Sequence, residues 1–213
     1  MIQIETFTFN SFQVNTYLVW DETGECLVVD PAFHTMEETS SFDGVISGRG
    51  LLLKGQVNTH CHVDHLLGVR HVREKYGLAF RANTEEEKNV KRAPLMGEVF
   101  GLKLDPVGAI EASIDDGGLI AVGNHQLKAI LVPGHSPGSL AIYSDEGGFV
   151  ITGDALFQGS IGRTDLPGGD YDQLIGSIRS RLLTLPPETI VYPGHGPSST
   201  IGEEKAANPF LHD

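Results

Sequence analysis

Runs of apolar residues, separated by turn residues, divide the chain into predicted strands and helices. Valine, isoleucine and aromatic residues fill these runs, which favours strands over loops. The predicted strands cover residues 5–10, 16–20, 25–30, 119–122, 127–132, 140–144, 149–152 and 189–192. The segment 145–148, DEGG, is typical of a hairpin turn between two of them.

Apolar residues at helical spacing predict helices between and after these strands. Leu66, Val69, Val72 and Tyr76 lie on one helical face, and Gly77 is a natural stop. Leu174, Ile178 and Leu182 mark a second amphipathic helix, for which Asp170 is the expected N-cap. Another helix is expected at 200–207. Residues 84–87, TEEE, form a capping-box pattern that predicts a helix ending near Pro94. Strands in both halves bounded by helices predict a layered α/β fold with two sheets inside.

The chain has 213 residues, of which 40% are hydrophobic and 20% charged, as in an ordinary globular protein. No linker or shift in composition divides it, so we expect a single domain over residues 1–213. The net charge of -13 argues against nucleic acid or an anionic membrane as a partner. With two cysteines, no signal-peptide pattern and no apolar run of ~20 residues, a cytoplasmic protein is expected.

The segment 59–65, THCHVDH, holds four metal-ligand side chains within six residues. In an extended segment, His60 and His62 point to the same side, and Cys61 points away. A turn after them would aim Asp64 and His65 at a neighbouring point. This segment therefore predicts contributions to two adjacent cations, with a structural role for Cys61.

Three more candidate ligands follow apolar runs that end in a glycine. His135 follows the apolar run 127–132, Asp154 follows the run 149–152, and His195 follows the run 189–192. Residues just after rigid strand ends commonly assemble sites at one edge of a sheet. The total is then seven nitrogen and oxygen donors, too many for one tetrahedral zinc, but suited to two metals with a bridging carboxylate.

The sequence resembles the metallo-β-lactamase superfamily, and within it the short bacterial type of the glyoxalase II (hydroxyacylglutathione hydrolase) branch. The segments that carry the likeness are THCHVDH, PGHSPGS at 133–139, TGDALFQGSIGRTDLPGGD at 152–170 and YPGHGP at 192–197. The resemblance implies a four-layer αββα sandwich, here without the C-terminal helical domain that binds glutathione. It also implies that His60, His62 and His135 hold one metal, that Asp64, His65 and His195 hold another, and that Asp154 bridges them.

The resemblance implies a metal-dependent hydrolase that cleaves a small acyl thioester, such as S-lactoylglutathione, by a metal-bound hydroxide oriented by Asp64 and Asp154. The expected cofactors are two divalent ions, zinc in the first place, with iron or manganese as alternatives. Arg163 stands where the family places a basic residue that contacts glutathione. No separate general acid is apparent in the sequence, which suits a thiol leaving group.

Several relatives of this branch offer other functions. The chief rival is a persulfide dioxygenase, which would bind a single iron through His60, His135 and Asp154. Zinc β-lactamases typically lack a histidine at the place of His65 and use a cysteine in the second site, and the tRNA-processing nucleases usually have RNA-gripping segments. A metal-binding protein without turnover is disfavoured because all seven ligand positions are filled.

Overall fold

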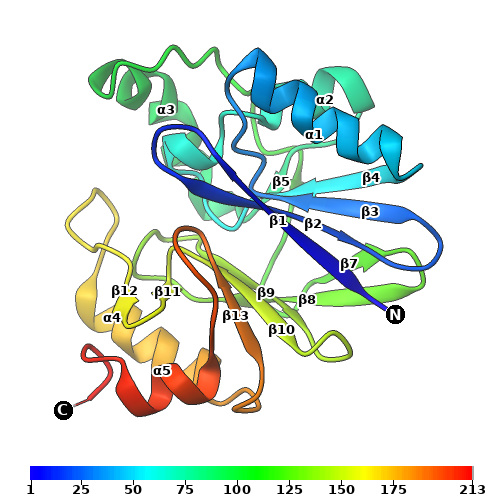
Figure 1. Ribbon diagram of the computed structural model, residues 1–213. Coiled ribbons are helices and arrows are strands. Elements are labelled where there is room, and N and C mark those ends of the chain that lie inside the picture. Colours follow the sequence, from blue (N-terminus) through cyan, green and yellow to red (C-terminus); the bar gives the residue numbers. More distant parts are fainter. Residues whose placement is uncertain (213) are drawn as a thin grey trace.

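Two β-sheets packed face to face form the centre of the molecule (Figure 1). The structure is a computed structural model and describes residues 1–212. The first sheet has the order β1-β2-β3-β4, with bounds Gln3–Phe9, Val14–Trp20, Glu25–Val29 and Leu52–Val57. The second has the order β14-β13-β10-β9-β8-β7, with bounds Ser199–Thr200, Ile190–Pro193, Phe149–Gly153, Leu140–Ser144, His125–Leu131 and Leu119–Val122. Two small pairs complete the strands, β5 (Arg81–Ala82) with β6 (Ala112–Ser113), and β11 (Leu156–Phe157) with β12 (Ser160–Ile161).

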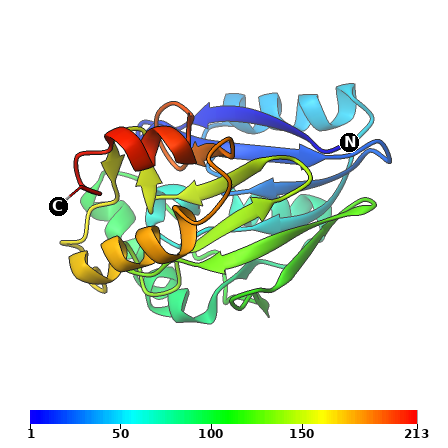
Figure 2. The same cartoon turned by 90° about the horizontal axis from the view of Figure 1, so that it is seen from below.

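Helices cover the outer face of each sheet. On the side of the first sheet lie α1 (Met36–Gly48), α2 (Val69–Tyr76) and α3 (Glu87–Val99). On the side of the second sheet lie α4 (Tyr171–Ser177), continued by a π-helical turn, and α5 (Ile201–Ala207), both in front in Figure 2. The expected four-layer αββα sandwich is therefore confirmed.

Residues 17–20 of strand β2 show why the central strands are mostly apolar. Tyr17 and Val19 enter the core between the two sheets, whereas Leu18 and Trp20 enter the core beneath α1. Successive side chains of a strand point to opposite faces, and here both faces are covered. A strand in this position therefore has no polar side.

Most of the predicted elements are present within a few residues of the expected bounds. The helix predicted after the THCHVDH segment is α2, and Gly77 ends it in the left-handed region at φ 66°. Asp170 caps α4 by accepting a hydrogen bond from the Gln173 N–H. The helix expected at 200–207 is α5, capped by Thr200.

The predicted boundaries of α3 are wrong. The side chain of Asn83 caps the turn that precedes it, one residue before the expected cap, and the helix runs through Pro94 to Val99. Proline removes one N–H donor, but packing of Val90 and Gly97 on either side of it keeps the helix intact. Helix α1 was not predicted, although Thr35 and Glu38 form a complete capping box at its start.

The strand ends that precede the candidate ligands lie at one edge of the sandwich. Strands β10 and β13 are parallel, and β8 runs in the same direction because both β8 and β10 are antiparallel to β9. Their carboxyl ends therefore meet at the same edge of the second sheet. Strand β4 precedes the THCHVDH segment, and just after this strand the Thr59 carbonyl accepts a hydrogen bond from the N–H of Leu140 at the start of β9. The fold thus brings segments from over half the chain to one place.

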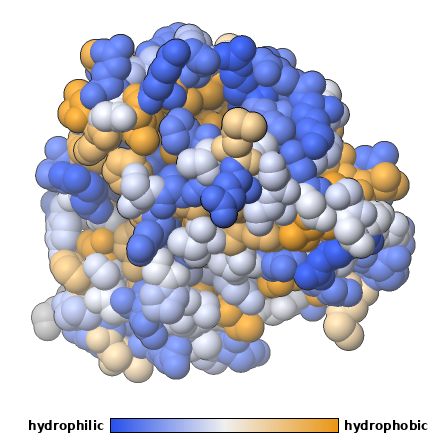
Figure 3. Space-filling view, turned by 45° about the horizontal axis from the view of Figure 1, so that its top comes forward, coloured by the Kyte–Doolittle hydropathy of each residue, from blue (hydrophilic) through white to orange (hydrophobic). Residues whose placement is uncertain are grey.

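The surface is mostly polar, as the charge of the chain suggests. Figure 3 shows blue and white side chains over most of one face, with apolar side chains gathered toward the side of α3. Helix α3 exposes Leu95 and Val99, and Phe100 follows it. Within residues 1–212, none of the helices has the length and hydrophobicity that a membrane crossing needs.

Gly153, the residue before Asp154, provides a test of this arrangement. It adopts φ +51°, and a Cβ there would lie 2.3 Å from the Thr59 Oγ1. Gly159 also has a positive φ, +64°, but open space around it. In urea unfolding of the metal-free protein, Gly159→Ala should lower the free energy of unfolding by the conformational cost alone, about 1 kcal/mol. Gly153→Ala should lower it by clearly more. Equal losses for both variants would contradict the close packing of Gly153 on the ligand segment.

Candidate metal centre

The THCHVDH segment leaves β4 in an extended form and then turns. His60 and His62 lie on the same side, with ring centroids 4.9 Å apart. A 3-10 turn over Val63–His65 follows and brings Asp64 and His65 beside them. The side chain of His65 is fully buried, and that of His60 is 1% exposed. The predicted geometry of this segment is therefore present.

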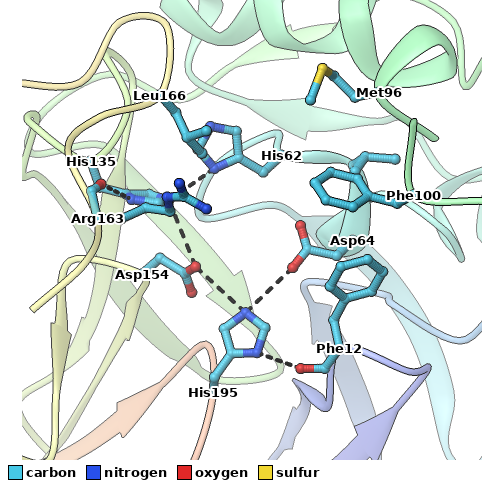
Figure 4. Close-up of a pocket in the computed structure, with 11 residues that line it drawn as sticks. Phe12, His62, Asp64, Met96, Phe100, His135, Asp154, Arg163, Leu166 and His195 are labelled. Carbon is cyan, nitrogen blue, oxygen red and sulfur yellow. Dashed lines mark hydrogen bonds and ion pairs between the residues drawn. The ribbon is translucent and has the colours of Figure 1, made fainter. Parts of the chain in front are cut away.

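The carboxylate of Asp154 lies at the centre of the cluster (Figure 4). Its Oδ2 is 3.9 Å from His60 Nε2, 3.7 Å from His135 Nε2 and 3.5 Å from His195 Nε2. Its Oδ1 is 3.4 Å from His65 Nε2. Asp154 therefore faces imidazoles from both halves of the predicted ligand set, as a bridging carboxylate must.

Two groups of three potential ligands surround Asp154. In each group, the ligand atoms lie within 4.8 Å of one another. One group is His60, His62 and His135, and the other is Asp64, His65 and His195. These are the two sets implied by the family resemblance, so all seven predicted residues converge, and their roles as ligands stay a prediction.

Several polar atoms in the cluster lack the partners that buried polar atoms need. His60 Nε2 is buried and makes no hydrogen bond within residues 1–212. His62 Nδ1 and His135 Nε2 lie 2.9 Å apart, a distance that requires either a proton or a cation between the two nitrogens. The donors are imidazole and carboxylate only, which suits zinc, iron or manganese. The residues therefore fit a pair of metal ions.

Acceptors on the protein hold the outer ring nitrogens. His135 Nδ1 donates to the Arg163 carbonyl at 2.8 Å, and His195 Nδ1 donates to the Phe12 carbonyl at 3.0 Å. Each bond leaves Nε2 as the free, ligating nitrogen and fixes the orientation of the ring. The Phe12 carbonyl comes from the turn between β1 and β2, a contact that the sequence did not predict.

Asp30 holds two more of these rings from the end of β3. This buried carboxylate accepts from His65 Nδ1 at 3.1 Å and from the Thr59 hydroxyl and backbone N–H, each at 2.7 Å. The Thr59 hydroxyl in turn accepts from His60 Nδ1 at 3.1 Å. Sequence analysis missed Asp30, although, like the ligands, it directly follows an apolar strand.

The electrostatics of the metal-free cluster are those of an anionic centre. Burial would raise the pKa of Asp154, but the nearby His65 and a hydrogen bond from His195 hold it well below its usual range. Burial would lower the pKa of His195, but hydrogen bonds to Asp154 and Asp64 raise it to about 9. In the metal-free protein, a proton on His195 therefore balances the negative charge of the Asp154 and Asp64 carboxylates. Bound cations would balance this charge in the metal-loaded site.

Two imidazoles of the first group, those of His60 and His62, are neutral instead. Burial, with the neighbouring His65, lowers the pKa of His60 well below its usual value. Burial and the neighbouring His135 lower the pKa of His62 to about 4. Neutral imidazole is the form that binds metals, so these rings are already in their ligating state at neutral pH.

Cys61 faces away from the ligands, as expected. It is completely buried in a cluster that includes Val69 and Phe80, and burial raises the pKa of its thiol well above its ordinary value. The thiol is therefore neutral and packs as an apolar side chain. Neither Cys61 nor Cys26 forms a disulfide.

A cavity of about 260 Å³ opens onto the cluster. Apolar side chains form much of its wall, namely Phe12, Val63, Met96, Phe100 and Leu166. Phe12 and Phe100 meet edge to face, with ring centroids 5.4 Å apart, and so join the β1–β2 turn to the end of α3 (Figure 4). Sequence reasoning missed this wall, because single apolar residues in loops carry no periodic signal.

Arg163 also lines the cavity, where the sequence analysis placed a substrate contact. Its guanidinium binds the Asp165 carboxylate through two hydrogen bonds, at 2.7 and 2.8 Å. The side chain is 59% exposed, so the pair is open to solvent and exchangeable. The position fits contact with a substrate, which stays a prediction.

The raised pKa of His195 predicts a pH-dependent stability of the metal-free protein. A folded pKa of about 9 exceeds the ordinary value of 6.5, so the folded state binds the extra proton between these pH values. The free energy of unfolding, measured with urea in the presence of a chelator, should therefore fall as the pH rises from 6.5 to 9. The slope should be shallower in His195→Gln. An unchanged slope in that variant would show that His195 is not the group responsible.

The chain is similar to known proteins over nearly its whole length. A family model described as the metallo-beta-lactamase superfamily matches residues 10–195. Hydroxyacylglutathione hydrolase GloC of Haemophilus influenzae is 34% identical over 213 residues, which cover 99% of each chain.

Three solved structures are similar to the whole fold. BLEG-1, described as a B3 metallo-beta-lactamase, has a TM-score of 0.91 and 30% identity, over 99% of this chain and 100% of that chain. TTHA1623 in a di-iron-bound form has a TM-score of 0.88 and 35% identity, over 97% of this chain and 100% of that chain. ETHE1 from Myxococcus xanthus has a TM-score of 0.79 and 29% identity, over 97% of this chain and 83% of that chain. The family model, the relative and the fold together show that the chain belongs to the metallo-beta-lactamase superfamily.

Proposed function

We propose that this chain is a metal-dependent thioesterase that hydrolyses a small acyl thioester, with S-lactoylglutathione as the first candidate. The observation that carries the proposal is the set of side chains around the cavity. Every titratable side chain of the cavity wall is a predicted metal ligand, except for Arg163. An arginine stays protonated and cannot deliver a proton to a leaving group.

The reaction therefore needs a leaving group that departs without a general acid. A thiol with a pKa of about 8.5 leaves readily as the thiolate, whereas an amine requires protonation first. This difference favours a thioester over an amide or a β-lactam. The similarity to GloC, whose name describes hydrolysis of an acylglutathione, supports the same substrate class.

The residues divide the work of holding and orienting. In this proposal, His60, His62 and His135 hold the first metal, Asp64, His65 and His195 hold the second, and Asp154 contacts both. When bound, a pair of divalent cations supplies Lewis acidity and lowers the pKa of a shared water to about 7. Zinc is the proposed metal, and the di-iron form of TTHA1623 makes iron the first alternative.

In this proposal, side chains of the protein orient the attacking water and exclude bulk water from the site. The Asp64 and Asp154 carboxylates lie on either side of His195, with oxygens 3.4 and 3.5 Å from its Nε2, so both can accept hydrogen bonds from a water between them. The wall that includes Phe12 and Phe100 limits access of bulk water, which strengthens electrostatic interactions inside.

Arg163 is the proposed contact for the thiol portion of the substrate. Its guanidinium can exchange the Asp165 carboxylate for a substrate carboxylate at little cost, because the pair is exposed. Glutathione carries two carboxylates that could take this place. Because this contact would serve substrate binding, its loss would raise KM more than it would lower kcat.

A second candidate is the oxidation of a persulfide by a single iron. It is favoured by the similarity to ETHE1 and by the positions of His60 and His135 around Asp154, two histidines and one carboxylate. The convergence of His62, Asp64, His65 and His195 on the same cluster counts against it, because a single iron held by His60, His135 and Asp154 would leave these donors unused.

Parallel assays of the purified protein separate these functions. We expect hydrolysis of S-lactoylglutathione, measured by thiol release, with two metal ions per chain by elemental analysis. Oxygen consumption with glutathione persulfide, together with one iron per chain, would replace the proposal by the second candidate. A β-lactam is the third compound to assay, because of the likeness to BLEG-1. Cleavage of the β-lactam at a higher kcat/KM than that of S-lactoylglutathione would reject the thioester as the substrate.

Asp154→Ala tests the shared position of this carboxylate. Because Asp154 faces both groups of ligands, the variant should lose both metals, with affinity reduced more than about 100-fold, and should lose thioesterase activity with them. Asp165→Ala, which removes the exposed carboxylate partner of Arg163, is the control and should keep its metal content. Full activity in Asp154→Ala would disprove the bridging role.

A further inference from the structure

Glu86 is a fully buried carboxylate that belongs neither to the ligand set nor to an ion pair of residues 1–212. It ends the short turn Thr84–Glu86 that precedes α3. Its Oε2 accepts hydrogen bonds from the Cys61 N–H at 2.9 Å and the Asn89 side-chain amide at 2.8 Å, and its Oε1 accepts one from the Gly138 N–H at 2.8 Å. A buried carboxyl group is costly unless it is hydrogen-bonded, and two of the three donors that satisfy this one are backbone N–H groups.

The two backbone donors belong to two ligand segments that are far apart in the sequence. Cys61 lies between His60 and His62, and Gly138 lies three residues after His135. The two oxygens of one carboxylate therefore tie the segments together. This tie brings together the imidazoles of His62 and His135, whose Nδ1 and Nε2 atoms lie 2.9 Å apart.

The absence of a side chain at position 138 permits this contact. A Cβ on Gly138 would lie 2.9 Å from the Glu86 Cγ and 3.1 Å from the Asn83 Cβ. The backbone of the loop after His135 thus approaches the carboxylate more closely than any other residue type allows.

Asp30 makes the same kind of contact on the other half of the cluster. It accepts from the Thr59 N–H, whereas Glu86 accepts from the Cys61 N–H. Two buried carboxylates therefore hold alternate residues of the extended segment, and the residues that follow them, His60 and His62, face the centre. Asp30 also binds the ring of His65, whereas Glu86 reaches the segment of His135.

We propose that Glu86 is a positioning residue for the first metal group, which sets the separation of His62 and His135 by binding the backbones of both their segments. The inference rests on the metal centre of the proposed function. Glu86 touches neither substrate nor metal in this role.

Glu86→Gln tests the role with little change in volume. The amide nitrogen cannot accept a hydrogen bond, so one of the two backbone N–H groups loses its acceptor. The probe is Co²⁺, added stepwise to the metal-free full chain and followed by its visible spectrum. We expect the affinity for one of two Co²⁺ ions to fall about 10- to 100-fold, with an altered spectrum, and the affinity for the other to change less than about 3-fold.

Glu204 provides a matched control. It is also a buried glutamate, 2% exposed, that accepts from a backbone N–H (Gly159) and an asparagine amide (Asn208), but it holds no ligand segment. Glu204→Gln should lower the urea midpoint as Glu86→Gln does and leave both Co²⁺ affinities and the spectrum unchanged. A purely structural role of Glu86 predicts that the two variants behave alike.

A His195→Ala background identifies the affected group, because it removes a ligand of the second set only. In this background, Glu86→Gln should still weaken the remaining Co²⁺. If Glu86→Gln does not fold, Gly138→Ala, which displaces the carboxylate, should weaken the same ion. Unchanged Co²⁺ binding in Glu86→Gln, or an equal change in Glu204→Gln, would overturn the role of Glu86. Failure of the unsubstituted chain to bind two Co²⁺ ions would instead overturn the metal centre itself.

Discussion

The concentration of imidazoles and carboxylates around Asp154 is the constraint on which the rest of the structure depends. Four imidazoles have a ring nitrogen within 3.9 Å of this buried carboxylate. Without cations, such a cluster leaves buried lone pairs unpaired and imidazoles charged, and both are costly in a protein interior. A structure that holds these groups together must therefore be rigid, and two packed sheets supply that rigidity.

The surrounding acceptors show how the rigidity reaches the ligands. Carbonyls of Phe12 and Arg163 hold two rings by their outer nitrogens, and Asp30 holds a third directly. Glu86 binds backbone rather than rings, and so controls the path of two segments instead of the orientation of one side chain. The β1–β2 turn that carries Phe12 also contributes to the apolar wall of the cavity, so the candidate ligands and the cavity share this support.

The sequence predicted the strands, and the set of histidines and aspartates that converge, well, because both depend on local pattern. Runs of apolar residues identify strands that are buried on both faces, and a glycine followed by histidine or aspartate identifies the strand end that carries a candidate ligand. The errors lie where distant packing overrides local preference. Helix α3 continues past Pro94 because its later turns pack against the loop that follows, with Gly97 close to Leu104.

By itself, the sequence determined the fold class, the superfamily and which seven residues could be ligands, since residue type and spacing along strands are local properties. Only the tertiary structure decided which imidazoles face one another, which acceptors hold them and which side chains enclose the cavity. Asp30, Glu86 and Phe12 act through contacts with residues 25 or more positions away, among them Thr59, Cys61 and His195. Contacts of that kind arise from the packing of sheets and loops, and no pattern in a single segment encodes them.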